Sequence, residues 1–256
     1  MTQPSFPQRL VVLIYGVIAY VFFLASISYA AGFVGNILVP KSIDSAPTLP
    51  ASLALLVDAG LLVLFAVQHS LMARPFFKAW LTRFIPATAE RSTYVLASSL
   101  ALIALFCFWQ PLGGVVWAIN HPVVRFLLYC GSAFGWLLVL ATTFLINHFD
   151  LFGLRQVWLQ FTGRPYTALP FGTPAFYKLV RHPLYLGLFF AFWCTPVMTA
   201  AHLFFAVGTA AYIFLGIQLE ERDLRQAHPE YADYQRTTPM LVPRLGDKTP
   251  GESRSV

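Results

Sequence analysis

The sequence predicts an all-α protein, a polytopic transmembrane helical bundle of five to six membrane helices that includes a C-terminal helical hairpin. Of its 256 residues, 57% are hydrophobic and 11% are charged, whereas about a quarter of the residues in a soluble domain are charged. The mean hydropathy is +0.65, and apolar runs long enough to cross a bilayer recur along the chain. We therefore expect one integral membrane domain over residues 1–246 and a disordered tail over residues 247–256.

The first four spans are predicted from apolar runs at residues 10–34, 52–72, 93–109 and 123–146. The first run is longer than the ~7–15 apolar residues of a signal peptide, so we expect it to be retained as a helix. The fourth run contains Gly131 and Gly135, a spacing that allows close contact between membrane helices.

The last apolar segment predicts a helical hairpin with arms at residues 184–198 and 202–218. Each arm is short for a span, and Pro196 should end or kink the first arm. The pair is therefore compatible with a tilted or incomplete crossing. Residues 219–227 should continue the second arm as a helix into water, and a polar tail should follow from His228.

The distribution of basic residues predicts the orientation in the membrane. With the N-terminus inside, all of the 17 lysines and arginines except Lys41 and Arg125 fall on the inner face, and such a bias marks the cytoplasmic side. We expect a bacterial inner-membrane protein with both termini in the cytoplasm. The net charge of +6 thus reports topology, and nucleic-acid binding is not expected. The three cysteines lie in apolar runs and the histidines are scattered, so no metal site is predicted.

A basic and aromatic cluster precedes the hairpin, and it is the first candidate binding site. Its members are Arg181, His182, Pro183, Tyr185, Leu186 and Gly187. Pro183 suits the first turn of a helix, whose free N–H groups and positive dipole end favour an anion. Arg181 adds a fixed positive charge, and Gly187 would let a ligand approach the backbone. The alternative is basic anchoring at the membrane surface with an interfacial tyrosine.

An acidic pair, Glu220 and Glu221, stands where the return helix should leave the membrane. Negative charge near a helix C-terminus is disfavoured by the dipole, so a cation should lie nearby. In the functional interpretation the pair binds the ammonium group or a ribose hydroxyl of a ligand. In the structural alternative a neighbouring arginine such as Arg181 neutralises the pair. The hairpin brings this pair and the basic cluster to one face, which suits a small zwitterionic ligand.

Asp58 and His69 are the candidates for catalysis inside the bundle. They are eleven residues apart, which places them within ~20° of each other on one helix face and about three turns apart along it. Ionisable groups at membrane depth are functional candidates by default, and His69 could act as a general base. Alternatively, Asp58 only bonds a neighbouring helix and His69 is interfacial. Tyr94 could orient a substrate, and Gln156 could belong to a cofactor lid.

Several of these motifs together resemble the isoprenylcysteine carboxyl methyltransferase family of integral membrane methyltransferases. The resemblance is carried by Arg181-His182-Pro183-x-Tyr185-x-Gly187, Glu220-Glu221-x-x-Leu224, Tyr231-x-x-Tyr234 and Pro243. In the N-terminal half, His69-Ser70 and Glu90-Arg91-x-x-Tyr94 resemble the bacterial NnrU-like branch.

The resemblance implies a cytosolic-face site for S-adenosyl-L-methionine, which is released as S-adenosyl-L-homocysteine. It further implies that Arg181 and His182 meet the methionine carboxylate and that Glu220 and Glu221 meet the ammonium or ribose. The implied substrate is a small volatile thiol that arrives through lipid, methanethiol becoming dimethyl sulfide, with His69 as its base. No obligate protein partner is evident.

Three other functions compete with this one. The first is a membrane methyltransferase for a different thiol or a lipid-like carboxylate. The second is a non-enzymatic NnrU-like membrane protein of nitrogen-oxide metabolism, which would bind no cofactor. The third is a membrane reductase, which should carry a larger basic pocket for a dinucleotide phosphate. A channel or transporter is disfavoured because no internal repeat is evident.

Overall fold

The computed structural model describes residues 4–244, and within them five helices are long and apolar enough to cross a membrane. They are α1 (Phe6–Gly35), α2 (Ala51–Ala73), α4 (Glu90–Phe108), which continues the short 3-10 turn η1 (Ala87–Ala89), α5 (Pro122–Ile146) and α9 (Ala200–Ala227). The predicted all-α membrane bundle is confirmed, and the protein is an integral membrane protein. Its four N-terminal spans lie within a few residues of the predicted runs.

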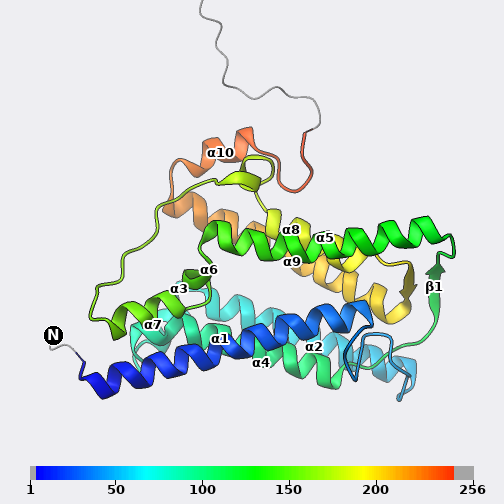
Figure 1. Ribbon diagram of the computed structural model, residues 1–256, viewed down its shortest axis with the longest axis horizontal. Helices are drawn as coiled ribbons and strands as arrows, with labels where there is room; N and C mark the ends of the chain where they lie inside the picture. Colours follow the sequence, from blue (N-terminus) through cyan, green and yellow to red (C-terminus); the bar gives the residue numbers. More distant parts are fainter. Residues whose placement is uncertain (1–3, 245–256) are drawn as a thin grey trace, which may run out of the picture.

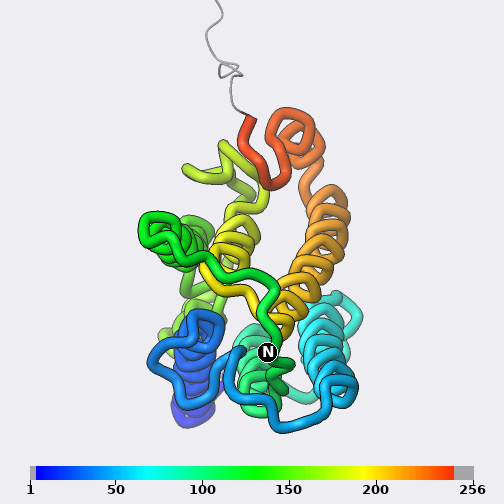
Figure 2. Tube along the Cα trace, turned by 90° about the vertical axis from the view of Figure 1, so that its right-hand side faces the viewer, coloured from blue at the N-terminus to red at the C-terminus, as the bar shows by residue number. Residues whose placement is uncertain are grey.

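Six apolar helices, five long and one short, form two layers of three. α1, α4 and α2 make one layer, and α5, α8 (Pro183–Trp193) and α9 make the other (Figures 1 and 2). Within the layers α1 packs on α4, α4 on α2, α5 on α8 and α8 on α9, while α2 packs against α9 across the layers. The hairpin and the second span are thus neighbours, which brings the two groups of candidate residues to adjacent helices.

The hairpin differs from its prediction at the turn. Its first arm, α8, has 11 residues and ends at Trp193, which at 1.5 Å per residue is about half of a 30 Å bilayer core. The strand β2 (Val197–Thr199) follows and pairs antiparallel with β1 (Val115–Ala118), and neither strand was predicted. α9 continues unbroken to Ala227, as expected for residues 219–227.

Short helices cover the inner end of the bundle. They are α3 (Pro75–Leu81), α6 (His148–Leu151), α7 (Leu154–Phe161), η2 (Ala175–Lys178) and α10 (Tyr231–Thr237). α10 lies in the segment expected to be a polar tail, and it sits beside the inner ends of α8 and α9 (Figure 1). The tail predicted to be disordered, residues 247–256, lies outside the described residues.

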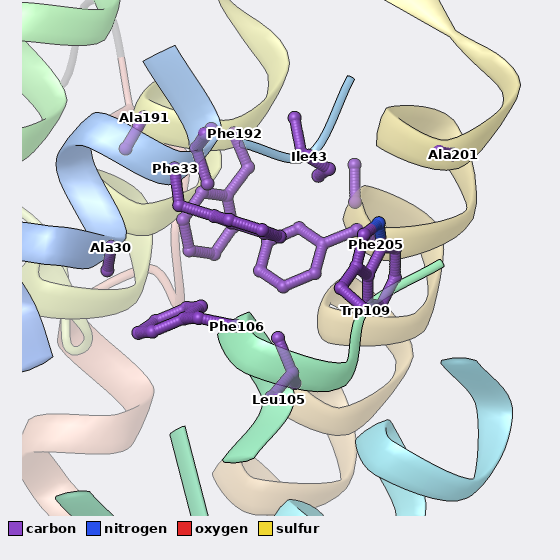
Figure 3. Close-up of a cluster of buried hydrophobic side chains, with 12 residues drawn as sticks. Ala30, Phe33, Ile43, Leu105, Phe106, Trp109, Ala191, Phe192, Ala201 and Phe205 are labelled. Carbon is purple, nitrogen blue, oxygen red and sulfur yellow. The ribbon is translucent and has the colours of Figure 1, made fainter. Parts of the chain in front are cut away.

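The largest buried apolar cluster lies at the outer ends of four helices. Phe33 comes from the end of α1, Phe106 from the end of α4, Phe192 from the end of α8 and Phe205 from the start of α9, with Trp109 beside them (Figure 3). Ring centroids are 5.0 Å apart for Phe33 and Phe106 and 5.1 Å for Phe192 and Phe205. This aromatic cluster packs the outer ends of these helices against one another.

Two glycines set the contact between α5 and α8. A Cβ atom added to Gly135 would lie 2.5 Å from the carbonyl oxygen of Gly187, and one added to Gly187 would lie 2.8 Å from that of Gly135. The close approach predicted for the glycine spacing in the fourth span is therefore present. At Gly187 the backbone that the missing side chain admits is that of α5.

Candidate active site at the inner face

The basic cluster and the acidic pair meet at the start of α8. Pro183 is the first residue of this helix, as predicted. The Arg181 guanidinium donates from Nε to Glu221 Oε1 at 2.8 Å and from Nη1 to the carbonyl oxygens of Gln235 and Thr238 at 2.9 and 2.6 Å. His182 Nε2 lies 2.9 Å from the same Glu221 oxygen.

Glu221 is thus held by the protein itself. Its second oxygen accepts a hydrogen bond from Gln235 Nε2 at 2.7 Å, and its side chain is only 8% exposed. The structural alternative, an arginine as the counter-ion, is the one realised for Glu221. The carboxylate joins α9 to the start of α8 and to α10, and it offers no free oxygen to a ligand.

Glu220 is the open member of the pair. Its side chain is 48% exposed, and its Oε2 accepts a hydrogen bond from the Tyr185 hydroxyl at 3.1 Å. Arg181 also keeps one terminal nitrogen, Nη2, that donates to no other residue in the described part of the chain. One carboxylate and one guanidinium nitrogen therefore remain for a ligand with an ammonium and a carboxylate.

The segment around α10 is bonded to this cluster by its backbone. The N–H groups of Arg181 and His182 donate to the carbonyl oxygens of Pro239 and Met240 at 2.9 and 3.2 Å. The Tyr234 hydroxyl donates to the Tyr177 carbonyl oxygen at 2.5 Å, and burial raises the pKa of Tyr234 to about 12. This hydroxyl consequently remains a donor throughout the physiological pH range.

His69 and Tyr94 form the second polar cluster, between α2 and α4. The Tyr94 hydroxyl lies 2.7 Å from His69 Nε2, and Ser98 Oγ lies 3.1 Å from His69 Nδ1. The Phe65 ring stacks on the imidazole at 5.2 Å between centroids, and Tyr212 of α9 approaches its edge at 6.4 Å. The imidazole is therefore held between two hydroxyl groups and two aromatic rings.

Asp58 does not contact the cluster of His69 and Tyr94 in the structure. Its Oδ1 accepts a hydrogen bond from the backbone N–H of Gln110 at 2.8 Å, just beyond the outer end of α4, and the residue is completely buried. Asp58 and His69 share a helix face, but eleven residues separate them by about 16 Å along the axis. The alternative, a bond from Asp58 to a neighbouring segment, is the one observed.

Contacts of α9 connect the two clusters. The Tyr212 hydroxyl lies 3.1 Å from Ser70 Oγ on α2, and the Arg74 guanidinium pairs with Asp223 at 3.0 Å. The Tyr185 hydroxyl donates to Glu220 of α9 at 3.1 Å. Polar side chains of α9 therefore contact both the start of α8 and α2, the helix that carries His69.

The two remaining predicted residues have separate surroundings. Leu186 packs with the apolar cluster formed by Ile213, Ile217 and Leu241. Gln156 lies on α7, where its Nε2 donates to the Asp150 carbonyl oxygen at 3.1 Å, and it lines a cleft of about 350 Å³ at the inner face. Leu186 therefore has a packing role in the structure, whereas Gln156 lies half-buried at the edge of the cleft.

Comparison with known proteins identifies the family. The chain is 55% identical over 246 residues to methanethiol S-methyltransferase of Crocosphaera subtropica, an alignment that covers 96% of each chain. It is 48% identical to methanethiol S-methyltransferase of Mycobacterium tuberculosis, over 92% of this chain and 97% of that protein. This chain belongs to the methanethiol S-methyltransferase family.

More distant similarity extends beyond the methanethiol S-methyltransferase family. Nurim of Sus scrofa is 32% identical over 180 residues, which cover 66% of this chain and 67% of that protein. No family model matches the chain, and no solved structure matches it significantly. The family membership confirms the resemblance to membrane methyltransferases that the motifs indicated.

Sequence reasoning missed three residues of the site in this methanethiol S-methyltransferase family member. Ser98 lies one helical turn after Tyr94, so the four-residue spacing could have placed it on the same face. Tyr212 is a hydroxyl group inside an apolar run, which is the signal of an inward-facing position. Gln235 left no comparable signal, because its contact with Glu221 depends on the docking of α10.

Proposed function

We propose that this chain is a methyltransferase that transfers a methyl group from S-adenosylmethionine to methanethiol and forms dimethyl sulfide. The observation that carries this proposal is the identity of 55% with a methanethiol S-methyltransferase across 96% of both chains. The polar cluster of His69 and Tyr94 near the inner face, together with the aromatic rings packed at the outer end, supports the proposal. A charged donor and an uncharged thiol can meet there.

The free groups at the inner face fit the methionine part of the donor. The exposed carboxylate of Glu220 suits the ammonium, and the Nη2 group of Arg181 with the N-terminus of α8 suits the carboxylate. Glu221 acts as a positioning residue, because its two oxygens orient Arg181, His182 and Gln235. When bound, S-adenosylmethionine supplies a methyl group already activated by its sulfonium.

The chemistry left to the protein is to hold the thiol and to take its proton. The thiolate is the effective nucleophile, and His69 is the base within the bundle to which the S–H proton passes. Tyr94 and Ser98 fix the imidazole ring through its two nitrogens, and Phe65 and Tyr212 provide apolar walls for a small thiol. Proximity and orientation in a site shielded from water account for most of the expected acceleration.

The membrane orientation follows from the same arrangement. The inner ends of α8 and α9 carry Arg181 and Glu220, and within residues 4–244 the basic residues other than Lys41 and Arg125 belong to segments at that end. We place this side in the cytoplasm of a bacterial inner membrane, where S-adenosylmethionine is made, with both termini on the same side.

The test combines binding and product formation with the purified protein in detergent. Calorimetry should detect S-adenosylhomocysteine binding to wild type, weakened about tenfold by Glu220→Gln, the loss expected for one charge-assisted contact. The matched control is Glu230→Gln, a carboxylate that is 57% exposed nearby and should bind normally. Headspace gas chromatography should detect dimethyl sulfide from methanethiol.

Two results would contradict the proposal in different ways. A well-folded wild type that binds no S-adenosylhomocysteine and forms no dimethyl sulfide would favour the non-enzymatic membrane protein. Binding of the donor product without methylation of methanethiol, but with methyl-ester formation on a lipid-like carboxylate, would retain the methyltransferase and replace its substrate.

A further inference from the structure

Arg91, near the start of α4, is a positive charge without a carboxylate partner. Its Nε donates to the Leu151 carbonyl oxygen at 2.7 Å, and its two terminal nitrogens donate to no residue that the structure describes. No aspartate or glutamate within residues 4–244 forms an ion pair with Arg91, whereas Arg74 pairs with Asp223 at 3.0 Å. The charge of Arg91 is therefore not neutralised by a carboxylate of the described chain.

The Arg91 guanidinium faces the proposed reaction centre. The side chain is half-buried, and its guanidinium carbon lies 5.1 Å from the centre of the Tyr94 ring, which is a cation–π arrangement. The centre of the Tyr94 ring is in turn 4.9 Å from that of the His69 ring, and the Tyr94 hydroxyl lies 2.7 Å from His69 Nε2. The guanidinium carbon is therefore within about 10 Å of the imidazole centre.

The remaining charges around His69 and Tyr94 do not replace that of Arg91. The other charged or titratable groups that surround these two rings are Arg74 of α2, Glu90 of α4, Tyr185 of α8, and Tyr212 and Asp223 of α9. Tyrosine hydroxyls are uncharged at neutral pH, and Arg74 is paired with Asp223. Glu90 acts on Tyr94, whereas Arg91 acts on both Tyr94 and His69.

The proposed reaction forms an anion at this place. When the S–H bond of methanethiol breaks, the proton passes to a nitrogen of His69, and the electron pair stays on sulfur until it forms the new carbon–sulfur bond. Like a free cysteine thiol, whose pKa is ~8.5, a small alkanethiol is mostly protonated at neutral pH. A fixed cation nearby favours the thiolate over the thiol, and it also favours release of the proton from the imidazolium.

We propose that Arg91 is the cation that stabilises the thiolate formed beside His69. The inference rests on the proposed function. Because the guanidinium acts across the Tyr94 ring, Arg91 is a positioning residue and not a contact of the thiol. Two unit charges ~10 Å apart, at an effective dielectric constant of ~20, interact by the equivalent of about one pH unit. The charge of Arg91 should therefore raise the population of thiolate about tenfold.

The experiment measures dimethyl sulfide formation by the full-length protein over a range of pH, with wild type beside Arg91→Gln and Arg91→Lys. Arg91→Gln should lower kcat about tenfold at neutral pH and move the rising limb of the pH profile about one unit to higher pH. Its kcat should approach that of wild type as the pH rises, because the thiol then ionises without the cation. Arg91→Lys keeps the positive charge and should restore most of the rate.

Two controls separate this role from a folding or donor-binding role. Arg83→Gln removes an exposed arginine from the segment between α3 and α4, and its kcat and pH profile should equal those of wild type. In calorimetry, S-adenosylhomocysteine should bind Arg91→Gln as tightly as it binds wild type.

Three results would contradict the reasoning in different ways. A kcat of Arg91→Gln that equals wild type, or that is lowered by the same factor at every pH, would overturn the assignment of Arg91. Weaker binding of S-adenosylhomocysteine with an unchanged pH profile would overturn it in favour of a contact between Arg91 and the donor. A wild type that forms no dimethyl sulfide would instead overturn the proposed function.

Discussion

The contact between α5 and α8 gives a quantitative test of why Gly187 is a glycine. An alanine Cβ at Gly135 would lie 2.5 Å from backbone atoms of Ala191 and Gly187, and one at Gly187 would lie 2.8 Å from the Gly135 carbonyl oxygen. Backbone atoms cannot rotate away as a side-chain end can, so one helix must shift. Ordinary contact begins at 3.4 Å, which requires a separation of nearly 1 Å at Gly135.

The expected loss of stability follows from two opposing terms. Replacement of glycine by alanine inside a helix is favourable by about 0.5–1 kcal/mol. Overpacking of a tight contact costs typically about 1–3 kcal/mol, and a clash with backbone belongs to the upper part of that range. We expect Gly135→Ala and Gly187→Ala to lose about 1–2 kcal/mol each. Gly60→Ala on α2, where no atom lies within 4 Å of the new Cβ, should be neutral or stabilising.

Thermal unfolding in one detergent, followed by tryptophan fluorescence, should give lower melting temperatures than wild type for Gly135→Ala and Gly187→Ala. The melting temperature of Gly60→Ala should be equal to that of wild type or higher. Calorimetry with S-adenosylhomocysteine should find Gly135→Ala and Gly187→Ala weakened together, because both displace the start of α8, where Arg181 and His182 lie. If Gly187→Ala lost binding at an unchanged melting temperature while Gly135→Ala bound normally, Gly187 would be a ligand contact and the packing explanation would be refuted.

Three further substitutions test the remaining assignments. His69→Asn should lower kcat by about 10²–10⁴-fold, the usual contribution of a general base, without weakening S-adenosylhomocysteine; an unchanged kcat would remove His69 from the chemistry. Asp58→Leu should cost about 1–3 kcal/mol in thermal or denaturant unfolding, because the Gln110 N–H loses its acceptor, and the surviving protein should keep its kcat. The pKa of Tyr234, raised to about 12 by burial, favours its protonated form in the folded state. The stability advantage of wild type over Tyr234→Phe should therefore be constant below pH 10 and disappear as the pH rises through 12, in parallel melting curves.

The membrane spans could be predicted because their signal is local. Each apolar run contains its own evidence, so α2 and α5 lie within one residue of the predicted bounds. The strands and α10 carry no such signal. β1 and β2 exist because residues 115–118 and 197–199 pair across a long stretch of chain, and α10 is held by contacts such as Tyr234 to Tyr177. Such partners are fixed only by the three-dimensional fold.

The candidate site divides in the same way. Helical periodicity correctly gave Asp58 and His69 a common face, but it carries no information on their partners at different depths. Asp58 meets Gln110 at the outer end, and His69 meets Tyr94 at the inner end. For the acidic pair, charge alone could not distinguish the buried, saturated Glu221 from the exposed Glu220. That distinction depends on which of the two neighbours faces Arg181.

The depth of His69 explains how one site can serve two substrates of opposite polarity. His69 lies four residues before the end of α2, and Tyr94 lies four residues after the start of α4, so both are about 6 Å from the inner ends of their helices. A charged donor can reach that depth from the aqueous face, whereas crossing the bilayer core would be prohibitive for it. An uncharged thiol has no such barrier and can enter through lipid. Because the aromatic cluster of Phe33 and Trp109 packs the outer ends of the helices, the proton released from the thiol is expected to return to the inner side.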